Sequence, residues 1–230
     1  SMLRSAAKNF NDVAVVTDIN DYDKILEELE QGGISYETRR ALAIKVFNTT
    51  ASYDAAIANY FNKKDKLVPE RLTLSYNLQD SLRYGENPHQ KAYHYVQDNN
   101  ESYALQNAVQ LHGKEMSYNN IQDASAALDI LSEFDETTCV AVKHMNPCGV
   151  ATGSSVFEAY SRAYEADPVS IFGGIVAVNG KVDKETAEKM HSIFLEIILA
   201  TDYDEEALEI LTKKKNLRIY KLSEKNNNHE

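Results

Sequence analysis

One stretch decides how this sequence is interpreted: Thr138-Cys139-Val140-Ala141-Val142-Lys143-His144-Met145-Asn146-Pro147-Cys148-Gly149. Its first five residues are apolar or β-branched, which predicts a buried strand that ends near Lys143. Lys143 and His144 then stand at a strand end, where the catalytic groups of open α/β sheets collect. Neighbouring strand residues face opposite ways, so the two side chains share a site only if the chain turns. We expect Pro147 and Gly149 to supply that turn.

The Lys-His pair suits acid–base chemistry. The ammonium of Lys143 disfavours a second positive charge on the adjacent ring, which leaves His144 able to accept a proton near pH 7. The same ammonium can stabilise an anion that develops during a reaction. Residue type alone also permits a surface charge next to a hydrogen-bonded strand end, because Lys-His dipeptides are common.

A second polar segment, at residues 82 to 90, reads Leu-Arg-Tyr-Gly-Glu-Asn-Pro-His-Gln. The guanidinium of Arg83 can hold a phosphate through two parallel N–H bonds, and Tyr84 adds a hydroxyl group or a ring face. The alternative is a polar surface turn, which the Asn-Pro pair and the glycine favour. A third segment, residues 112 to 124, places Asn119, Asn120 and Asp123 where an apolar helix begins.

Apolar periodicity and turn residues predict alternating strands and helices. We expect strands at residues 13 to 17, 72 to 76, 92 to 96, 138 to 143, 171 to 178 and 218 to 222. We expect helices at residues 21 to 30, 36 to 61, 120 to 133, 155 to 166, 183 to 192 and 204 to 214. Such alternation favours an α/β sandwich. Pro69 opens a linker, and we place a domain boundary after residue 75.

Composition excludes several classes of protein. The formal net charge of −11 argues against a nucleic-acid partner, because such binding relies on clustered Lys and Arg. With 43% hydrophobic residues and no long apolar run, we expect neither a membrane span nor a membrane partner. The opening lacks a secretory signal pattern, and the 2 cysteines fit a reducing compartment, so we expect a cytoplasmic protein.

Three motifs, R-Y-G-x-N-P-H-Q, K-H-x-N-P-C-G and F-G-G, occur here in a characteristic order. With them, the chain closely resembles the bifunctional purine-biosynthesis family that joins aminoimidazole carboxamide ribonucleotide (AICAR) transformylase to inosinate cyclohydrolase. The resemblance implies a piece of a longer protein. Residues 1–75 resemble the mainly helical C-terminal piece of the α/β cyclohydrolase domain. Residues 76–230 resemble the first half of the transformylase domain, a cytidine-deaminase-like α/β sandwich.

The resemblance also implies an activity, which is formyl transfer from the cosubstrate 10-formyltetrahydrofolate to the exocyclic amine of AICAR. Cyclisation of the product to inosinate (IMP) follows in the intact protein, which the resemblance implies is a homodimer. The implied catalytic residues are Lys143 and His144 for transfer and Lys8 for ring closure. The implied substrate-binding residues are Arg83, Tyr84, His89, Asn120, Asn146, Gly173 and Glu196. Thr201 replaces the proline usual in relatives, which makes Glu196 the least secure of these assignments.

Two alternatives accompany this interpretation. The deaminase-like fold raises the possibility of a zinc deaminase, which needs H-x-E and P-C-x-x-C ligands. Pro147-Cys148 begins the second signature, but Ala151 stands where its next cysteine belongs and no His-x-Glu precedes it, so we expect no metal. The other alternative is a truncated chain that binds nucleotide, or contributes to a dimer, without turnover.

Overall fold

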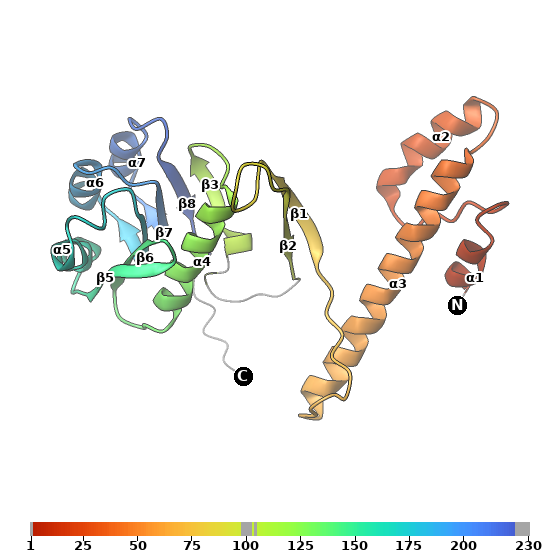
Figure 1. Cartoon of the computed structure of the whole chain (residues 1–230), viewed down its shortest axis with the longest axis horizontal. Coiled ribbons are helices and arrows are strands. Elements are labelled where there is room, and N and C mark those ends of the chain that lie inside the picture. The colour runs from red at the N-terminus through yellow and green to blue at the C-terminus, as the bar shows by residue number, and fades with distance from the viewer. Residues whose placement is uncertain (1, 98–102, 104, 224–230) are drawn as a thin grey trace. The chain divides into compact units, whose positions relative to one another are not determined.

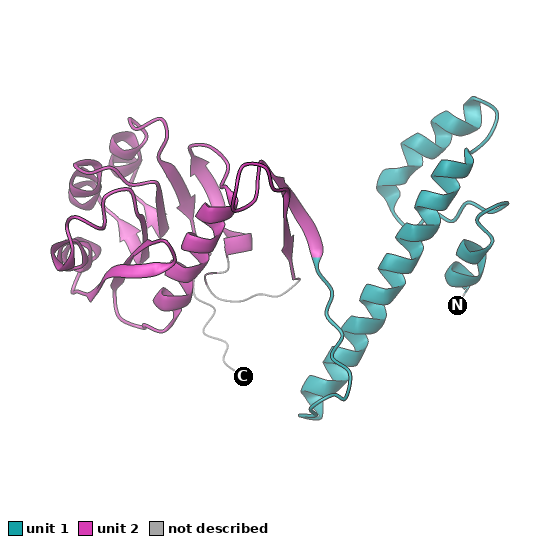
Figure 2. Cartoon of the chain, viewed as in Figure 1, with its two compact units in different colours: residues 1–76 teal, residues 77–230 magenta. Residues whose placement is uncertain are grey.

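The computed structural model describes residues 2–97, 103 and 105–223. The chain divides into two compact units, Ser1–Tyr76 and Asn77–Glu230 (Figure 2). None of the described helices combines the length and the apolar character that crossing a bilayer requires.

Unit 1 is helical in its described part (Figure 1). Its elements are α1 (Met2–Lys8), the 3-10 turn η1 (Ile19–Asp21), α2 (Tyr22–Glu30) and α3 (Tyr36–Lys64). Helix α3 begins after Ser35, whose hydroxyl accepts the Thr38 N–H, as a helix N-cap does. A small core gathers Ala7, Ala43 and Val46 between α1 and α3.

The prediction of strands at residues 13 to 17 and 72 to 76, in unit 1, is wrong. Residues 13 to 17 and 72 to 76 have no regular secondary structure and belong to no sheet. A strand is stable only when its backbone groups pair with a neighbour, and unit 1 offers no neighbouring strand among its described residues. Residues 72 to 76 instead lead into unit 2, where the first strand begins at Asn77.

Unit 2 contains a six-stranded mixed sheet and a separate two-stranded hairpin (Figure 1). The hairpin pairs β1 (Asn77–Leu82) with β2 (Ala92–Val96). The sheet has the order β3-β8-β7-β6-β4-β5, in which β6, β7 and β8 are parallel and the outer pairings are antiparallel. Its strands are β3 (Val109–His112), β4 (Thr138–Lys143), β5 (Asn146–Thr152), β6 (Ile175–Val182), β7 (Ile197–Tyr203) and β8 (Arg218–Lys221).

Helices cover both faces of this sheet, so the expectation of an α/β fold is confirmed (Figure 1). One face packs on α4 (Tyr118–Ser132), with η2 (Leu105–Asn107) beside it. The other face carries α5 (Val156–Ala166), α6 (Lys184–His191) and α7 (Glu205–Leu211). Because both faces are covered, β4, β6 and β7 are buried along most of their length.

Candidate functional site

The sheet register brings most of the candidate residues to one edge. Lys143 pairs with Asn146, the preceding Val142 pairs with Ile175 at the start of β6, and Ile175 pairs with Ile197. The same row continues from Ile197 to the start of β8. We call this edge, together with the beginning of α4, the polar edge. The parallel strands β6, β7 and β8 contribute their amino ends to it, whereas β4 contributes its carboxyl end, at Lys143.

The chain turns at His144 and Met145, not at Pro147 and Gly149 as the sequence suggested. His144 has φ 53° and Met145 has φ 62°, so both central residues of this two-residue turn are left-handed. Pro147 lies within β5, at a register shift of this edge strand, where a missing N–H is tolerated. Gly149 lies under α5, since an added Cβ would stand 2.1 Å from the carbonyl oxygen of Ala163.

The Lys143 ammonium is fixed by backbone. Its Nζ donates to the carbonyl oxygen of Phe172 at 2.8 Å, which ties the end of β4 to the loop that precedes β6. In that loop Gly173 has φ +74°, and its N–H donates to the carbonyl of Phe194. Residues 171 to 174 therefore form a turn, and β6 begins four residues later than the sequence suggested. His144 beside Lys143 is exposed at the polar edge.

Asn120 and Glu196 meet at the polar edge, although 76 residues separate them in sequence. The Asn120 amide oxygen accepts from the backbone N–H and the hydroxyl of Ser117, which completes a capping box at the start of α4. Its amide nitrogen donates to Glu196 Oε2 at 2.9 Å. Because Asn120 is only 6% exposed, this side chain mainly joins α4 to the residue that precedes β7.

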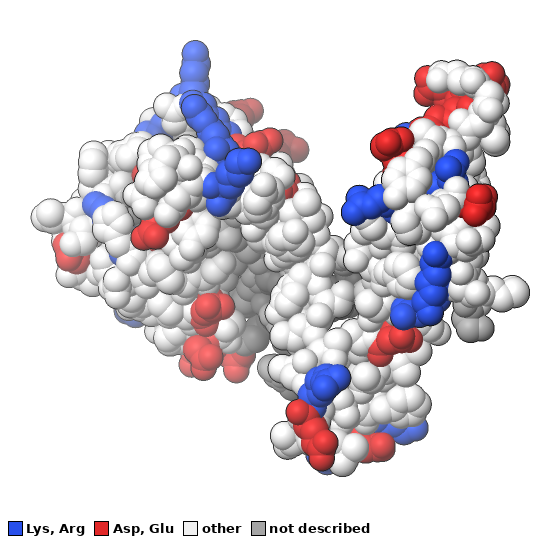
Figure 3. Space-filling view, turned by 45° about the vertical axis from the view of Figure 1, so that its right-hand side comes forward, with Lys and Arg blue, Asp and Glu red and all other residues white. Residues whose placement is uncertain are grey.

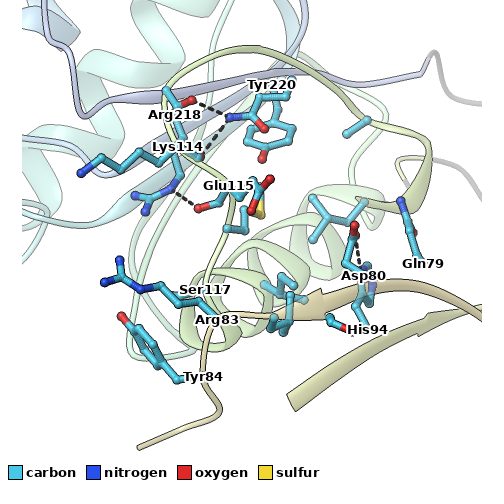
Figure 4. A pocket seen from close by; sticks show the side chains of 18 residues that line it. Gln79, Asp80, Arg83, Tyr84, His94, Lys114, Glu115, Ser117, Arg218 and Tyr220 are labelled. Atoms are coloured by element: carbon cyan, nitrogen blue, oxygen red, sulfur yellow. Dashed lines mark hydrogen bonds and ion pairs between the residues drawn. The ribbon is translucent and has the colours of Figure 1, made fainter. Parts of the chain in front are cut away.

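A cavity of about 870 Å³ lies beside the polar edge within unit 2 (Figure 4). The charged ends of Arg83, Lys114 and Arg218 extend toward the same side of it, with Tyr84 next to Arg83 (Figure 4). Among the described residues, none of these three cations forms an ion pair. The cavity can therefore receive an anion, in spite of the acidic charge of the whole chain.

Asp80 and Glu115 are the acidic residues that line the cavity. Asp80 lies 3.7 Å from His94 on the side away from the cations (Figure 4). The backbone carbonyl of Glu115 accepts from Arg218 Nε at 3.1 Å, which orients that guanidinium. The cavity also includes Ser117, so it adjoins the first turn of α4, where helix N–H groups favour negative charge.

Two expected site residues, His89 and Lys8, lie outside both the polar edge and the cavity of unit 2. His89 is exposed in a loop that Gln90 closes, through backbone and side-chain bonds to Asn87. Lys8 is exposed as the last residue of α1, in the other unit. The cavity of about 270 Å³ in unit 1 is lined by other residues, among them Lys45.

Neither cysteine is prepared for nucleophilic chemistry. Burial raises the pKa of the Cys139 thiol, and burial also raises the pKa of Cys148, so both are protonated near neutral pH. Within the described residues, no three His, Cys, Asp or Glu side chains gather in a way that could hold a metal ion. The titratable side chains named at the polar edge are therefore the amine of Lys143, the imidazole of His144 and the carboxylate of Glu196, which Asn120 binds.

Sequence reasoning assigned no role to Asp123 and Arg218. Asp123 Oδ1 accepts the Met145 N–H at 2.8 Å, so it contacts the turn that carries His144. Its position three residues after Asn120, on the same face of α4, is a signal that helix periodicity could have given. Arg218 gave no such signal, because only the register of β8 brings it to the polar edge.

The fold and the site together define an α/β protein with an amine–imidazole pair at one edge of its sheet and a cationic cavity that shares Ser117 and Arg218 with that edge. The chain belongs to the AICARFT/IMPCHase bienzyme family, whose sequence profile matches residues 6–230.

Individual relatives agree with this assignment. The chain is 58% identical over 225 residues to the "Bifunctional purine biosynthesis protein PurH" of Lactobacillus acidophilus, covering 96% of this chain and 44% of the relative. It is 58% identical over 220 residues to the protein of the same name from Lysinibacillus sphaericus, and 59% identical over 221 residues to that from Listeria monocytogenes serotype 4a. Each of these alignments covers 95% of this chain and 43% of the relative. The chain thus spans less than half the length of these relatives.

Proposed function

We infer that this chain supplies the nucleotide-binding and proton-accepting part of an AICAR formyltransferase in purine biosynthesis. The observation that carries the proposal is that one end of the sheet presents Lys143 and His144 and also places Arg218 in a cavity whose three cations form no ion pair among the described residues. Family membership supports the reaction, with 10-formyltetrahydrofolate as cosubstrate. In this proposal, residues 76–230 are the first half of the transformylase domain, with a cytidine-deaminase-like arrangement.

The chemistry suits the pair. The amine of AICAR is a weak nucleophile, because its lone pair is delocalised into the ring and the carboxamide. His144 accepts the amine proton as the nitrogen attacks the formyl carbon, and Lys143 stabilises the oxyanion that forms. The bond from the formyl carbon to the folate nitrogen then breaks, and that nitrogen takes the proton from His144. The result is formyl-AICAR and tetrahydrofolate.

The cavity is the proposed place for the nucleotide phosphate. Arg83 can bind two phosphate oxygens at once, and Tyr84 lies beside it. Lys114 and Arg218 add two positive charges on the same side of the cavity (Figure 4). Nearer the pair, Asn146 and Gly173 border the reacting groups, while Asn120 and Glu196 act by fixing the start of α4. His89 completes the set proposed from family resemblance.

Unit 1 is the proposed end of the cyclohydrolase domain, with Lys8 acting in ring closure once the rest of that domain is present. We also infer that α3 contributes to a homodimer. Its second half exposes large apolar side chains, with Tyr53 at 67%, Tyr60 at 61% and Phe61 at 53%. Figure 3 shows charged side chains on unit 1 separated by broad uncharged surface. Exposed apolar surface of this kind is typical of a protein interface.

Two substitutions in the full-length bienzyme test the proposal. His144→Ala should abolish formyl transfer with little change in AICAR affinity, whereas Arg83→Ala should weaken AICAR binding by about 10-fold or more. His191→Ala, in α6, is the matched control for loss of an imidazole. Near-normal transfer by the His144 variant would remove His144 as the base. Unchanged AICAR affinity in the Arg83 variant would remove Arg83 from the phosphate site.

A further inference from the structure

The turn that carries His144 has an unfavourable backbone. Two-residue hairpins with both central residues left-handed normally use Asn-Gly or Asp-Gly, because Cβ crowds the following carbonyl oxygen in this conformation. Glycine has no Cβ, and Asn or Asp offsets the cost through local hydrogen bonds. This turn has His144 at φ 53° and Met145 at φ 62°. His tolerates the left-handed region better than most residues, but an unbranched apolar residue such as Met does not. The conformation at Met145 therefore needs a contact that holds it.

Asp123 makes that contact. Its Oδ1 accepts the Met145 N–H at 2.8 Å, across 22 residues of sequence. The other described bond to the turn, from the Asn146 amide to the His144 carbonyl at 2.7 Å, stays within the hairpin. Asp123 is thus the described polar side chain that fixes the turn to another element. Charged acceptors make stronger bonds than neutral ones, so a carboxylate suits this task.

Asp123 itself stands on a rigid support. It is half-buried in the second turn of α4, whose first turn is fixed by the Ser117–Asn120 capping box. The bond from Asn120 to Glu196 fixes the same end of α4 to the residue that precedes β7. Contacts to the sheet therefore fix the start of α4, α4 fixes the Asp123 carboxylate, and that carboxylate fixes the turn that carries His144.

We propose that Asp123 is the positioning residue for His144, because its bond to the Met145 N–H keeps the left-handed turn that aims the imidazole at the substrate. The consequence for catalysis rests on the proposed function, since it requires His144 to be the base. The structural part does not, because the bond and the turn exist whatever the substrate is.

The structural part is tested on this 230-residue chain by hydrogen exchange of the Met145 amide, measured by NMR. Asp123→Ala should speed that exchange by about 10- to 100-fold, as loss of a bond to a charged group predicts. Asp123→Asn keeps an oxygen acceptor, so its Met145 exchange rate should lie between those of the wild type and the Asp123→Ala variant. Asp183→Ala is the matched control, because Asp183 Oδ1 accepts the Thr186 N–H at 2.9 Å, after the opposite end of β6. Equal Met145 exchange in the wild type and the Asp123→Ala variant would overturn the proposal.

The catalytic part is tested in the full-length bienzyme. Asp123→Ala should lower kcat by about 10- to 100-fold and leave the KM for AICAR nearly unchanged, since misplacement of a base affects the reaction step. Adding Met145→Gly should restore much of the rate, because glycine adopts the left-handed turn without help. A normal kcat in the Asp123→Ala variant, or no recovery in the double variant, would overturn the positioning role. If His144→Ala itself transferred formyl groups normally, the proposed function would fail, while Met145 exchange would still decide whether Asp123 holds the turn.

Discussion

Replacing Asn120 by alanine removes three hydrogen bonds at once. The Ser117 N–H and hydroxyl lose their acceptor, and Glu196 Oε2 loses the donor that stands 2.9 Å away. Water cannot readily replace these partners, because Asn120 is 6% exposed. Loss of the capping acceptor costs about 0.5–1.5 kcal/mol, and loss of the bond to a carboxylate costs about 1.5–3 kcal/mol. We therefore expect the free energy of unfolding of unit 2 to fall by about 2–4.5 kcal/mol.

The assay is urea unfolding of the chain, followed by circular dichroism. Asn119→Ala is the matched control, because Asn119 is the exposed neighbour in the same helical turn and should change stability by less than about 0.5 kcal/mol. A loss for Asn120→Ala no larger than that of the control would refute the reasoning. It would leave Asn120 free for the substrate-binding role that family resemblance suggests.

Asn120→Asp gives the same test a pH dependence. The substitution keeps the shape but places a second carboxylate about 3 Å from that of Glu196, and carboxylates this close must share a proton. The folded variant then binds more protons than the unfolded one, so its stability falls as pH rises. We expect the variant to lose most stability at neutral pH and to recover part of it near pH 4. A loss of stability that did not change with pH would contradict this.

Other parts of the chain give three further expectations. Gly149→Ala should lower stability by about 1–3 kcal/mol or more in urea unfolding, since its Cβ would stand 2.1 Å from the Ala163 oxygen and α5 would have to move; a loss below about 0.5 kcal/mol would contradict the packing. In unit 1, the hydrogen bond from the Thr38 hydroxyl lowers the pKa of Glu28. The ionised carboxylate therefore stabilises the fold above its usual pKa, and this stabilisation is lost as pH falls through the lowered pKa. Glu28→Gln should flatten the acid limb of the pH–stability curve. Because burial raises the pKa of Cys139 and of Cys148, a thiol reagent at pH 7 should label the folded chain much more slowly than the unfolded one, and equal labelling rates would exclude burial as the protection.

The parts of unit 2 that sequence could predict are those specified locally. The strand at residues 138 to 143 was predicted because a continuous apolar run marks a strand buried on both faces. The helix expected at residues 120 to 133 corresponds to α4, Tyr118–Ser132, because polar residues there lead into an apolar helical pattern. Lys143 and His144 were candidate site residues because they stand at the end of that strand.

Long-range contacts account for the parts that sequence missed. Nothing in His144 and Met145 indicates a left-handed turn, because the contact that holds it comes from Asp123 on another element. The strand expected at residues 13 to 17 failed for the opposite reason, since its local pattern was suitable but unit 1 offers it no described partner strand. Arg218 reached the polar edge only through the pairing of β8 with β7.

The central claim is that this chain by itself builds the nucleotide-binding part of the transfer site. Calorimetric titration of the 230-residue chain with AICAR tests it most directly, with the Arg83→Ala variant titrated in parallel. We predict saturable binding at one site that weakens by about 10-fold or more in the variant. A folded chain that binds no AICAR, or a variant that binds it as tightly as the wild type, would contradict the account.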